Sequence, residues 1–183
     1  EVQIPVEKPS AAEPVEQLRE ALRTSETAKI DDCISALSPD DQAHALSHLT
    51  QPEAATVLEL LPDEAAAHLV ESLPESQAVQ LIEQLDPEAA AGIVNEMESD
   101  EQADIIGRLS ETDAAAVLDN MRADEASDAR RLLEYAPESA GGLMVTEYLA
   151  YVDNLRVEDV VSDLRRNADK YRQYNVQYAF VVD

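Results

Sequence analysis

A repeat of twelve residues organises most of this chain. Leucine or methionine recurs at every twelfth position from Leu37 to Leu133. Three further positions of each unit are small or aliphatic in the same register, as at Ala43, Ala45 and Leu46. These spacings place the apolar side chains on one side of an α-helix, so each unit predicts one short amphipathic helix.

The boundaries between units carry helix-start signals at a constant phase. Hydroxyl, acidic or proline residues stand there, namely Ser38, Thr50, Pro62, Pro74, Asp86 and Ser110. Ser, Thr and Asp side chains accept hydrogen bonds from first-turn amides, and Pro needs no amide partner at that place. Ser38 with Asp41 and Thr50 with Glu53 resemble capping boxes. We therefore expect turns near residues 38, 50, 62, 74, 86, 98, 110 and 122.

A helix of this length is marginal alone in water, so it must stack on its neighbours. The predicted fold is mainly α, a superhelical solenoid of about ten short helices with an armadillo-like architecture. Two less regular helices are expected near Val15 to Arg23 and Thr27 to Ala36, and no β-sheet between Leu37 and Leu133. The track residues Leu61, Leu73, Leu85 and Leu109 are expected to be buried.

The charge of the chain limits its partners. The formal net charge is −26, from 39 acidic and 13 basic side chains. Such a field repels the phosphates of nucleic acid and of anionic lipid, so neither is an expected partner. It attracts cations, above all the divalent ions that carboxylates prefer, although acidity can equally serve solubility or adaptation to salt.

Other classes of function find little support in the residues. Cys33 is the only cysteine, which favours a reducing compartment such as the cytosol. No apolar run approaches the roughly 18 residues of a membrane-spanning helix, so we expect no direct membrane insertion of this segment. No catalytic constellation or cofactor motif occurs, and we do not expect an enzyme. His44 and His48 have zinc-ligand spacing, but we favour two solvated histidines.

The repeat alone is similar to two known modules. These are the N domain of MgtE magnesium transporters and the armadillo-like repeats of the flagellar switch protein FliG. The segment YAPESAGGLMVT, residues 135–146, separates them because it closely resembles the junction of the MgtE family. Its two consecutive glycines allow positive φ and close backbone approach, and Leu143 and Met144 can anchor the turn.

The tail resembles the beginning of a CBS domain. Tyr148, Ala150 and Val152 alternate as in a short strand, residues 155–166 predict a helix and residues 176–183 a second strand. The alternative is another small β-α-β unit. The resemblance implies four segments: a flexible leader at 1–14, an N-terminal superhelical domain at 15–135, a Gly-Gly linker at 136–147, and the truncated first part of a CBS domain at 148–183.

The resemblance also implies a function. MgtE-family N domains are cytosolic regulatory regions that close a magnesium transporter or channel when Mg²⁺ bridges their acidic residues to the CBS domains. The implied partners are the remaining CBS and transmembrane domains of a homodimeric, multi-pass parent protein in the bacterial inner membrane, with this segment on the cytoplasmic face. The resemblance ends at Asp183, before the late Thr and Asp with which many CBS domains hold adenine nucleotides, so we expect no nucleotide binding by these residues.

The candidate metal ligands come from the same resemblance. Glu88 matches a family ligand near the start of a middle helix, whereas two other acidic positions of the family correspond to Gly92 and Thr56. Asp100 and Asp104 lie one unit further on and could compensate. We therefore predict Glu88, Asp100 and Asp104 as weak, regulatory Mg²⁺ ligands, the alternative being solvated helix-start acids.

Two other functions stay open at this point. One is a protein-protein scaffold with FliG-like repeats, whose acidic surface would dock a basic partner. The other is a free-standing soluble repeat-CBS protein that has no pore.

Overall fold

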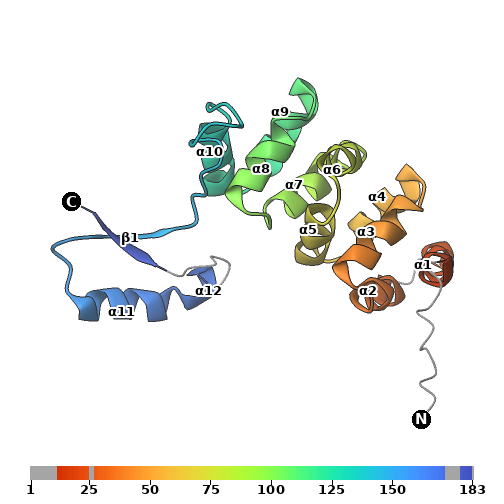
Figure 1. Cartoon of the computed structure of the whole chain (residues 1–183), viewed down its shortest axis with the longest axis horizontal. Helices are drawn as coiled ribbons and strands as arrows, with labels where there is room; N and C mark the ends of the chain where they lie inside the picture. The colour runs from red at the N-terminus through yellow and green to blue at the C-terminus, as the bar shows by residue number, and fades with distance from the viewer. Residues whose placement is uncertain (1–11, 25–26, 172–177, 183) are drawn as a thin grey trace, which may run out of the picture.

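The computed structural model describes residues 12–24, 27–171 and 178–182. Helices α1 to α10 follow one another along an arc, here called the superhelix (Figure 1). Their bounds are α1 (Ala12–Thr24), α2 (Thr27–Ser35), α3 (Pro39–Ser47), α4 (Gln51–Leu60), α5 (Asp63–Glu71), α6 (Glu75–Ile82), α7 (Pro87–Val94), α8 (Ser99–Ile106), α9 (Glu111–Asn120) and α10 (Ala123–Leu132). The mainly α superhelical fold is thereby confirmed.

The start of the superhelix differs slightly from the prediction. Helix α1 begins at Ala12, inside the segment predicted as a leader, whereas residues 1–11 lie outside the described residues. The two less regular helices expected from the sequence correspond to α1 and α2. Every helix within the described part of the chain is too short or too polar to cross a membrane.

The repeat phase sets where the helices start. The N-caps of α3 to α10 fall at the eight expected positions: Ser38, Thr50, Pro62, Pro74, Asp86, Glu98, Ser110 and Arg122. The capping box at Thr50 and Glu53 is complete. Ser38 accepts from the Asp41 amide, but the Asp41 carboxylate accepts from the Ser38 hydroxyl instead of its amide. The Asp86 side chain makes no cap hydrogen bond, so the acceptor role expected there is wrong.

Every second helix is a packing neighbour. The contacts run α1 with α3, α2 with α4 and so on to α8 with α10, and one apolar cluster extends from Leu18 to Ala129. The track residues expected to be buried are indeed 5–8% exposed: Leu61, Leu73, Leu85 and Leu109. Leu133 ends the track at 36% exposure, because no further repeat helix follows α10 to cover it.

The glycine pair of the linker serves close packing. A Cβ on Gly141 would lie 2.5 Å from the ring of Tyr135, and one on Gly142 would lie 2.5 Å from a backbone oxygen of Ala136. Neither glycine adopts the positive φ that the sequence allowed. Leu143 and Met144 are 68% and 40% exposed, so the prediction that they anchor the turn is wrong.

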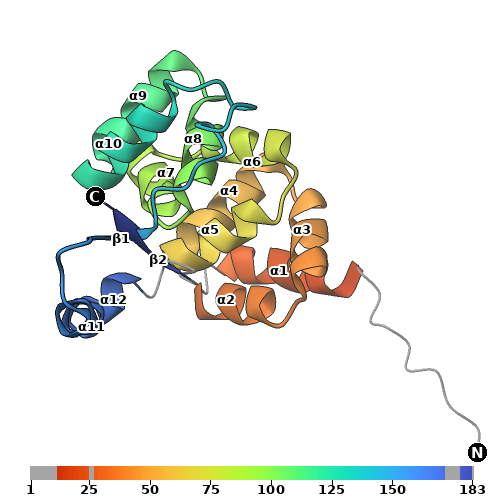
Figure 2. The ribbon, with the colours of Figure 1, turned by 60° about the vertical axis from the view of Figure 1, so that its left-hand side comes forward.

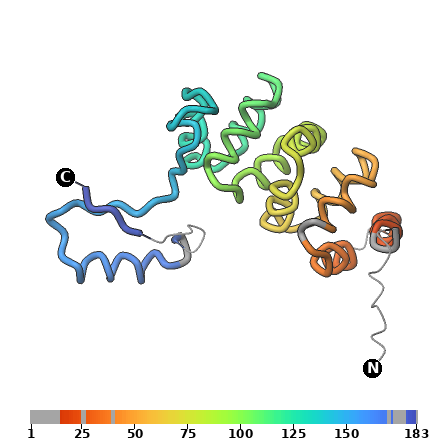
Figure 3. The backbone as a smooth tube through the Cα atoms, in the orientation of Figure 1, coloured from red at the N-terminus to blue at the C-terminus, as the bar shows by residue number. Residues whose placement is uncertain are grey.

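A small β-α-β unit follows the linker and is called the C-terminal unit. It comprises β1 (Leu149–Val152), α11 (Val157–Arg166), α12 (Ala168–Tyr171) and β2 (Ala179–Val182). The two strands are parallel, with Leu149 opposite Ala179. Figures 2 and 3 show this unit in blue beyond the superhelix. The strand-helix-strand order is as predicted, although residues 176, 177 and 183 of the second strand lie outside the described residues.

The buried residue of β1 is not one of the alternating apolar residues that predicted the strand. Leu149 is the buried residue of the strand, whereas Tyr148, Ala150 and Val152 are exposed. The apolar series that suggested a strand therefore does not form its buried face in this chain.

Candidate functional site

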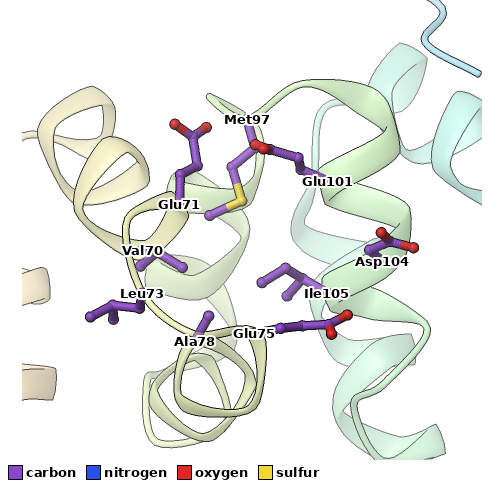
Figure 4. A pocket seen from close by; sticks show the side chains of 9 residues that line it. All are labelled: Val70, Glu71, Leu73, Glu75, Ala78, Met97, Glu101, Asp104 and Ile105. Carbon is purple, nitrogen blue, oxygen red and sulfur yellow. The ribbon is translucent and has the colours of Figure 1, made fainter. Parts of the chain in front are cut away.

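An acidic groove lies between α5, α6 and α8 (Figure 4). It is a cavity of about 210 Å³. Its lining combines buried apolar residues with four acids: Val70, Glu71, Leu73, Glu75, Ala78, Met97, Glu101, Asp104 and Ile105. The groove therefore sets carboxylates above apolar packing, where water screens their charges less well than on an open surface.

The repeat explains this composition. Leu73 and Met97 belong to the twelve-residue track, which turns toward the core. The acids occupy positions outside the tracks, at the end of α5, the start of α6 and along α8. Because α8 packs on α6, the acids of α8 come to lie opposite those of the α5–α6 junction.

Glu71 and Glu101 face each other in the groove. The Glu101 carboxyl group points from α8 toward Glu71 on α5 (Figure 4). Loss of water around this group, followed by the charge of Glu71 and a hydrogen bond with it, raises the pKa of Glu101 to about 7. The Glu101 residue as a whole is exposed, so water screens part of this interaction. Glu71 also contacts His68, with its Oε2 3.1 Å from Nδ1 of the imidazole.

Neighbouring carboxyl groups feel the same crowding. Burial, and then the charge of Glu75, raises the pKa of Asp104, while Arg108 acts in the opposite direction and also pairs with Glu75. Burial, and then the charges of Asp100 and Glu147, raises the pKa of Glu98. Negative charge is thus concentrated around α8 beyond what its arginine neighbour offsets.

This arrangement can take up protons or cations. A proton shared by Glu71 and Glu101 removes one charge, and a hydrated divalent ion between carboxylates would neutralise two. Within residues 12–24, 27–171 and 178–182, no three His, Cys, Asp or Glu side chains are placed to hold a metal ion as a group. Magnesium keeps several waters and is commonly held by one or two carboxylates, so the donor chemistry of the groove fits that ion.

The structure brings together two of the three predicted ligands. Asp100 and Asp104 lie one turn apart on α8, both half-buried, and the charge of Asp100 raises the pKa of Asp104. Asp104 lines the groove. Glu88 is exposed in the first turn of α7, and no hydrogen bond or ion pair described for the chain joins it to the other two.

A second acidic position lies beside Glu88. A Cβ on Gly92, one turn after Glu88, would lie 2.9 Å from Oδ2 of Asp63. The Asp63 carboxylate of α5 therefore occupies the space next to α7 where the family resemblance expects an acidic side chain. Thr56, the other departure from the family pattern, is exposed and donates its hydroxyl to the carbonyl of Pro52 at 2.8 Å.

Glu71 and Glu101 were not among the predicted site residues. They belong to different phases of the repeat and lie thirty residues apart. The sequence shows that the helices stack, but the packing of α6 on α8 is what brings Glu71, at the end of α5, opposite Glu101. His44 and His48 contact each other on an exposed face, with their Nε2 atoms 3.1 Å apart.

The comparisons with known proteins agree with the fold and the junction. Residues 37–138 match the family model of the MgtE intracellular N domain. The chain belongs to the MgtE N-domain family. That match covers more than half of the chain and separates it from the FliG-like alternative, as the junction sequence had suggested.

Two solved structures resemble the chain beyond that family match. One is the soluble part of a magnesium transporter, with a TM-score of 0.74 and 24% identity, covering 95% of this chain and 68% of that one. The other is the cytosolic domain of the Mg²⁺ channel MgtE in complex with ATP, with a TM-score of 0.76 and 27% identity, covering 92% of this chain and 68% of that one. The first likeness concerns the fold alone. No curated protein sequence matches the chain. The resemblance to the cytosolic part of an MgtE channel thus extends over most of this MgtE-family chain.

Proposed function

We propose that this chain is the magnesium-sensing regulatory region of an MgtE-type transporter or channel and has no catalytic activity. The observation that carries the proposal is the acidic groove, where Glu71 and Glu101 face each other and the pKa of Glu101 rises to about 7. Family membership and the likeness to the cytosolic domain of an Mg²⁺ channel support the choice of ion.

The proposed mechanism is electrostatic. Carboxylates that face one another across a gap disfavour close approach, and a cation that binds only the closed arrangement shifts the population toward it. At high Mg²⁺ concentration, ions would bridge acids of the superhelix to acids of the CBS domains and keep the pore shut. At low concentration the repulsion would separate the two parts and allow opening.

The superhelix offers two places for such bridges. Asp100 and Asp104 on α8 adjoin the acidic groove, and Glu88 on α7 lies one turn from the Asp63 carboxylate beside Gly92. Each place supplies one or two carboxylates, which suits weak binding of a hydrated ion completed by a second domain.

The C-terminal unit is, in this proposal, the first part of a CBS domain. Its helix α11 has no buried residue, and Phe180 and Val181 of β2 are 54% and 73% exposed. The remainder of the CBS pair would cover these apolar side chains. The parent protein would be a homodimer in the bacterial inner membrane, with this region on the cytoplasmic face.

The test compares this chain with a chain extended through the complete CBS pair. Both are titrated with MgCl₂ at constant ionic strength, because screening alone compacts an acidic chain, and the radius of gyration is measured by small-angle X-ray scattering. We expect magnesium-specific compaction of the longer chain, with added stability by mass action, and only weak binding by the shorter one. If the longer chain responds no more to Mg²⁺ than to a monovalent salt, the sensing proposal fails and the scaffold function replaces it.

Substitutions in the longer chain then test the ligands. Glu88→Ala, and separately Asp100→Ala with Asp104→Ala, should raise the Mg²⁺ concentration at half compaction. Glu59→Ala is the matched control, because Glu59 is an exposed acid on α4. An unchanged midpoint removes the residue concerned from the site and leaves the domain-level proposal standing.

A further inference from the structure

We infer that Ser99 and Glu147 form a clasp that fixes the direction in which the chain leaves the superhelix. Glu147 accepts hydrogen bonds from the Ser99 amide at 3.2 Å and from the Ser99 hydroxyl at 2.8 Å. The Thr146 amide in turn donates to the Ser99 hydroxyl oxygen at 2.8 Å. The clasp joins the end of the linker to the first residue of α8. It requires no ion and therefore goes beyond the proposed function.

Helix α8 is one of five repeat helices, with α5, α6, α7 and α10, whose N-cap side chain makes no cap hydrogen bond. Hydroxyl side chains that cap their own helices stand at the N-cap phase of three units: Ser38, Thr50 and Ser110. In α8 the same phase holds Glu98, whose side chain makes no cap hydrogen bond. The residue that carries a hydroxyl here is Ser99, one position after the N-cap phase. The acceptor for the Ser99 amide is Glu147, 48 residues away. Helix α8 thus has no local side-chain cap but has a long-range acceptor at its first amide.

Because Ser99 is buried, the loss of its hydrogen-bond partners would be costly. Ser99 is fully buried at 0% exposure, and the linker supplies both the acceptor and the donor that its hydroxyl uses. A buried hydroxyl or amide that loses its partner is costly, so departure of the linker is opposed unless water replaces these bonds. The two hydrogen bonds to the Glu147 carboxylate are also charge-assisted, and that carboxylate lies at the positive end of the α8 dipole.

Nearby charge acts against the clasp. Burial, and then the charges of Asp100 and Glu147, raises the pKa of Glu98, so Glu147 is close enough to Glu98 for the two carboxyl groups to repel each other. The hydrogen bonds to Ser99 must outweigh this repulsion for the linker to stay in place. The clasp therefore depends on a balance between hydrogen bonding and charge repulsion. Removal of one acceptor, Glu147, should release it.

The clasp positions the C-terminal unit. Leu143, Met144 and Val145 are exposed, so apolar packing does not hold this part of the linker. The Tyr148 amide donates to the carbonyl of Thr146 at 3.0 Å, and β1 begins at the next residue. A fixed Thr146–Glu147 pair consequently sets the path of β1 relative to α8, the helix that carries Asp100 and Asp104.

The test measures a distance between the two parts of the molecule. Nitroxide labels are placed by Glu59→Cys on α4 and Arg165→Cys on α11, both exposed, in the full chain carrying Cys33→Ala. Double electron-electron resonance should give one narrow distance distribution for the intact clasp. Ser99→Ala or Glu147→Ala should lower the ratio of clasped to released molecules roughly tenfold to a hundredfold, the scale of hydrogen bonds to a charged group. Glu147→Gln keeps one acceptor oxygen and should give an intermediate width.

Two comparisons keep the test decisive. Glu138→Gln removes one charge from the same linker at an exposed residue and should leave the distribution narrow. Circular dichroism identifies any variant with a damaged superhelix, and Glu147→Ala, which lies outside every helix, decides the matter if Ser99→Ala unfolds α8. The inference is wrong if Glu147→Ala leaves the distribution narrow, or if Glu138→Gln broadens it equally.

Discussion

The superhelix and the C-terminal unit both contain short amphipathic helices, but they use apolar side chains in opposite ways. In the superhelix the track residues Leu61 and Leu85 are 5% and 7% exposed. In the C-terminal unit, α11 has as many residues as α4 but no buried one, and Val157 is 79% exposed. The difference shows that a repeat unit packs on the next unit but one, whereas α11 presents a face that the described part of the chain leaves uncovered. Helix α11 stands apart from the superhelix in Figures 1 and 3.

Polar contacts hold the C-terminal unit together instead. The Asp163 carboxylate of α11 accepts hydrogen bonds from the hydroxyls of Tyr151 at 2.9 Å and Tyr171 at 2.8 Å, and from the Asn167 amide at 2.7 Å. The parallel pairing of β1 with β2 adds backbone hydrogen bonds. Interactions of this kind are worth little where water competes for them, so we expect the unit to be much less stable than the superhelix.

The largest expected effect comes from a matched pair of leucine truncations. Leu85→Ala removes a track side chain that is 7% exposed, leaves a cavity, and should lower the free energy of unfolding by about 2–5 kcal/mol. Leu164→Ala on α11, where the leucine is 37% exposed, should change it by less than about 1 kcal/mol. Urea unfolding followed by far-ultraviolet circular dichroism measures both. Equal losses in the two variants would break the contrast between the regions.

A smaller effect on stability is expected from the carboxyl group of Glu101, which lies near other negative charges in the superhelix. The pKa of Glu101 is about 7 in the folded chain against 4.5 for an ordinary glutamate, so the folded state binds the extra proton. Stability should therefore fall as the pH rises from about 4.5 to 7, because the unfolded chain releases this proton first. Glu101→Gln should flatten that decline, by an amount that solvent screening keeps modest.

The measurement is the thermal midpoint between pH 4.5 and 8 at constant ionic strength. Glu59→Gln serves as the control, since it removes the same charge from an exposed site on α4 and should retain the decline. His68 contacts Glu71, so His68→Gln is included to separate its contribution. A decline of the same size in Glu101→Gln would place the pH dependence elsewhere in the molecule.

The smallest effect is expected in the C-terminal unit. Burial, and then the hydrogen bond to Asp163, raises the pKa of Tyr151 to about 12. Asp163→Asn removes the negative acceptor and should lower the pKa of Tyr151 toward 10 without restoring it fully, because the burial remains. Titration of tyrosinate absorbance in Tyr151→Phe and parent chains isolates this residue. An unchanged tyrosinate titration in Asp163→Asn would show that the hydrogen bond from Tyr151 to Asp163 does not contribute to holding the unit together.

The sequence predicted the structure best in the repeat region, where the same local interactions recur in each unit. The twelve-residue phase located every N-cap of α3 to α10, and the side chains of Ser38, Thr50 and Ser110 cap their helices through neighbours in the chain. It failed at Leu143 and Met144, whose burial depends on what packs against the linker. It could not find Ser99 with Glu147, or Glu71 with Glu101, since both pairs arise from stacking between distant segments.

Only part of the candidate site could be predicted from the sequence, for the same reason. Asp100 and Asp104 share one helix face, which their spacing of four residues already indicates. The Asp63 carboxylate beside Gly92 comes from another helix, and no local pattern announces it. The selection of magnesium rests on family resemblance, because carboxylate spacing on a helix does not distinguish an ion site from a solvated face.

Amide hydrogen exchange across the chain tests the contrast between the two regions most directly. We expect the amides of α5 to α8 to exchange slowly and those of α11 much faster, because few buried contacts protect α11. In a chain extended through the CBS pair, α11 should gain protection while α7 stays unchanged. If α11 of the present chain already exchanges as slowly as α7, the C-terminal unit is stable by itself and the account is wrong.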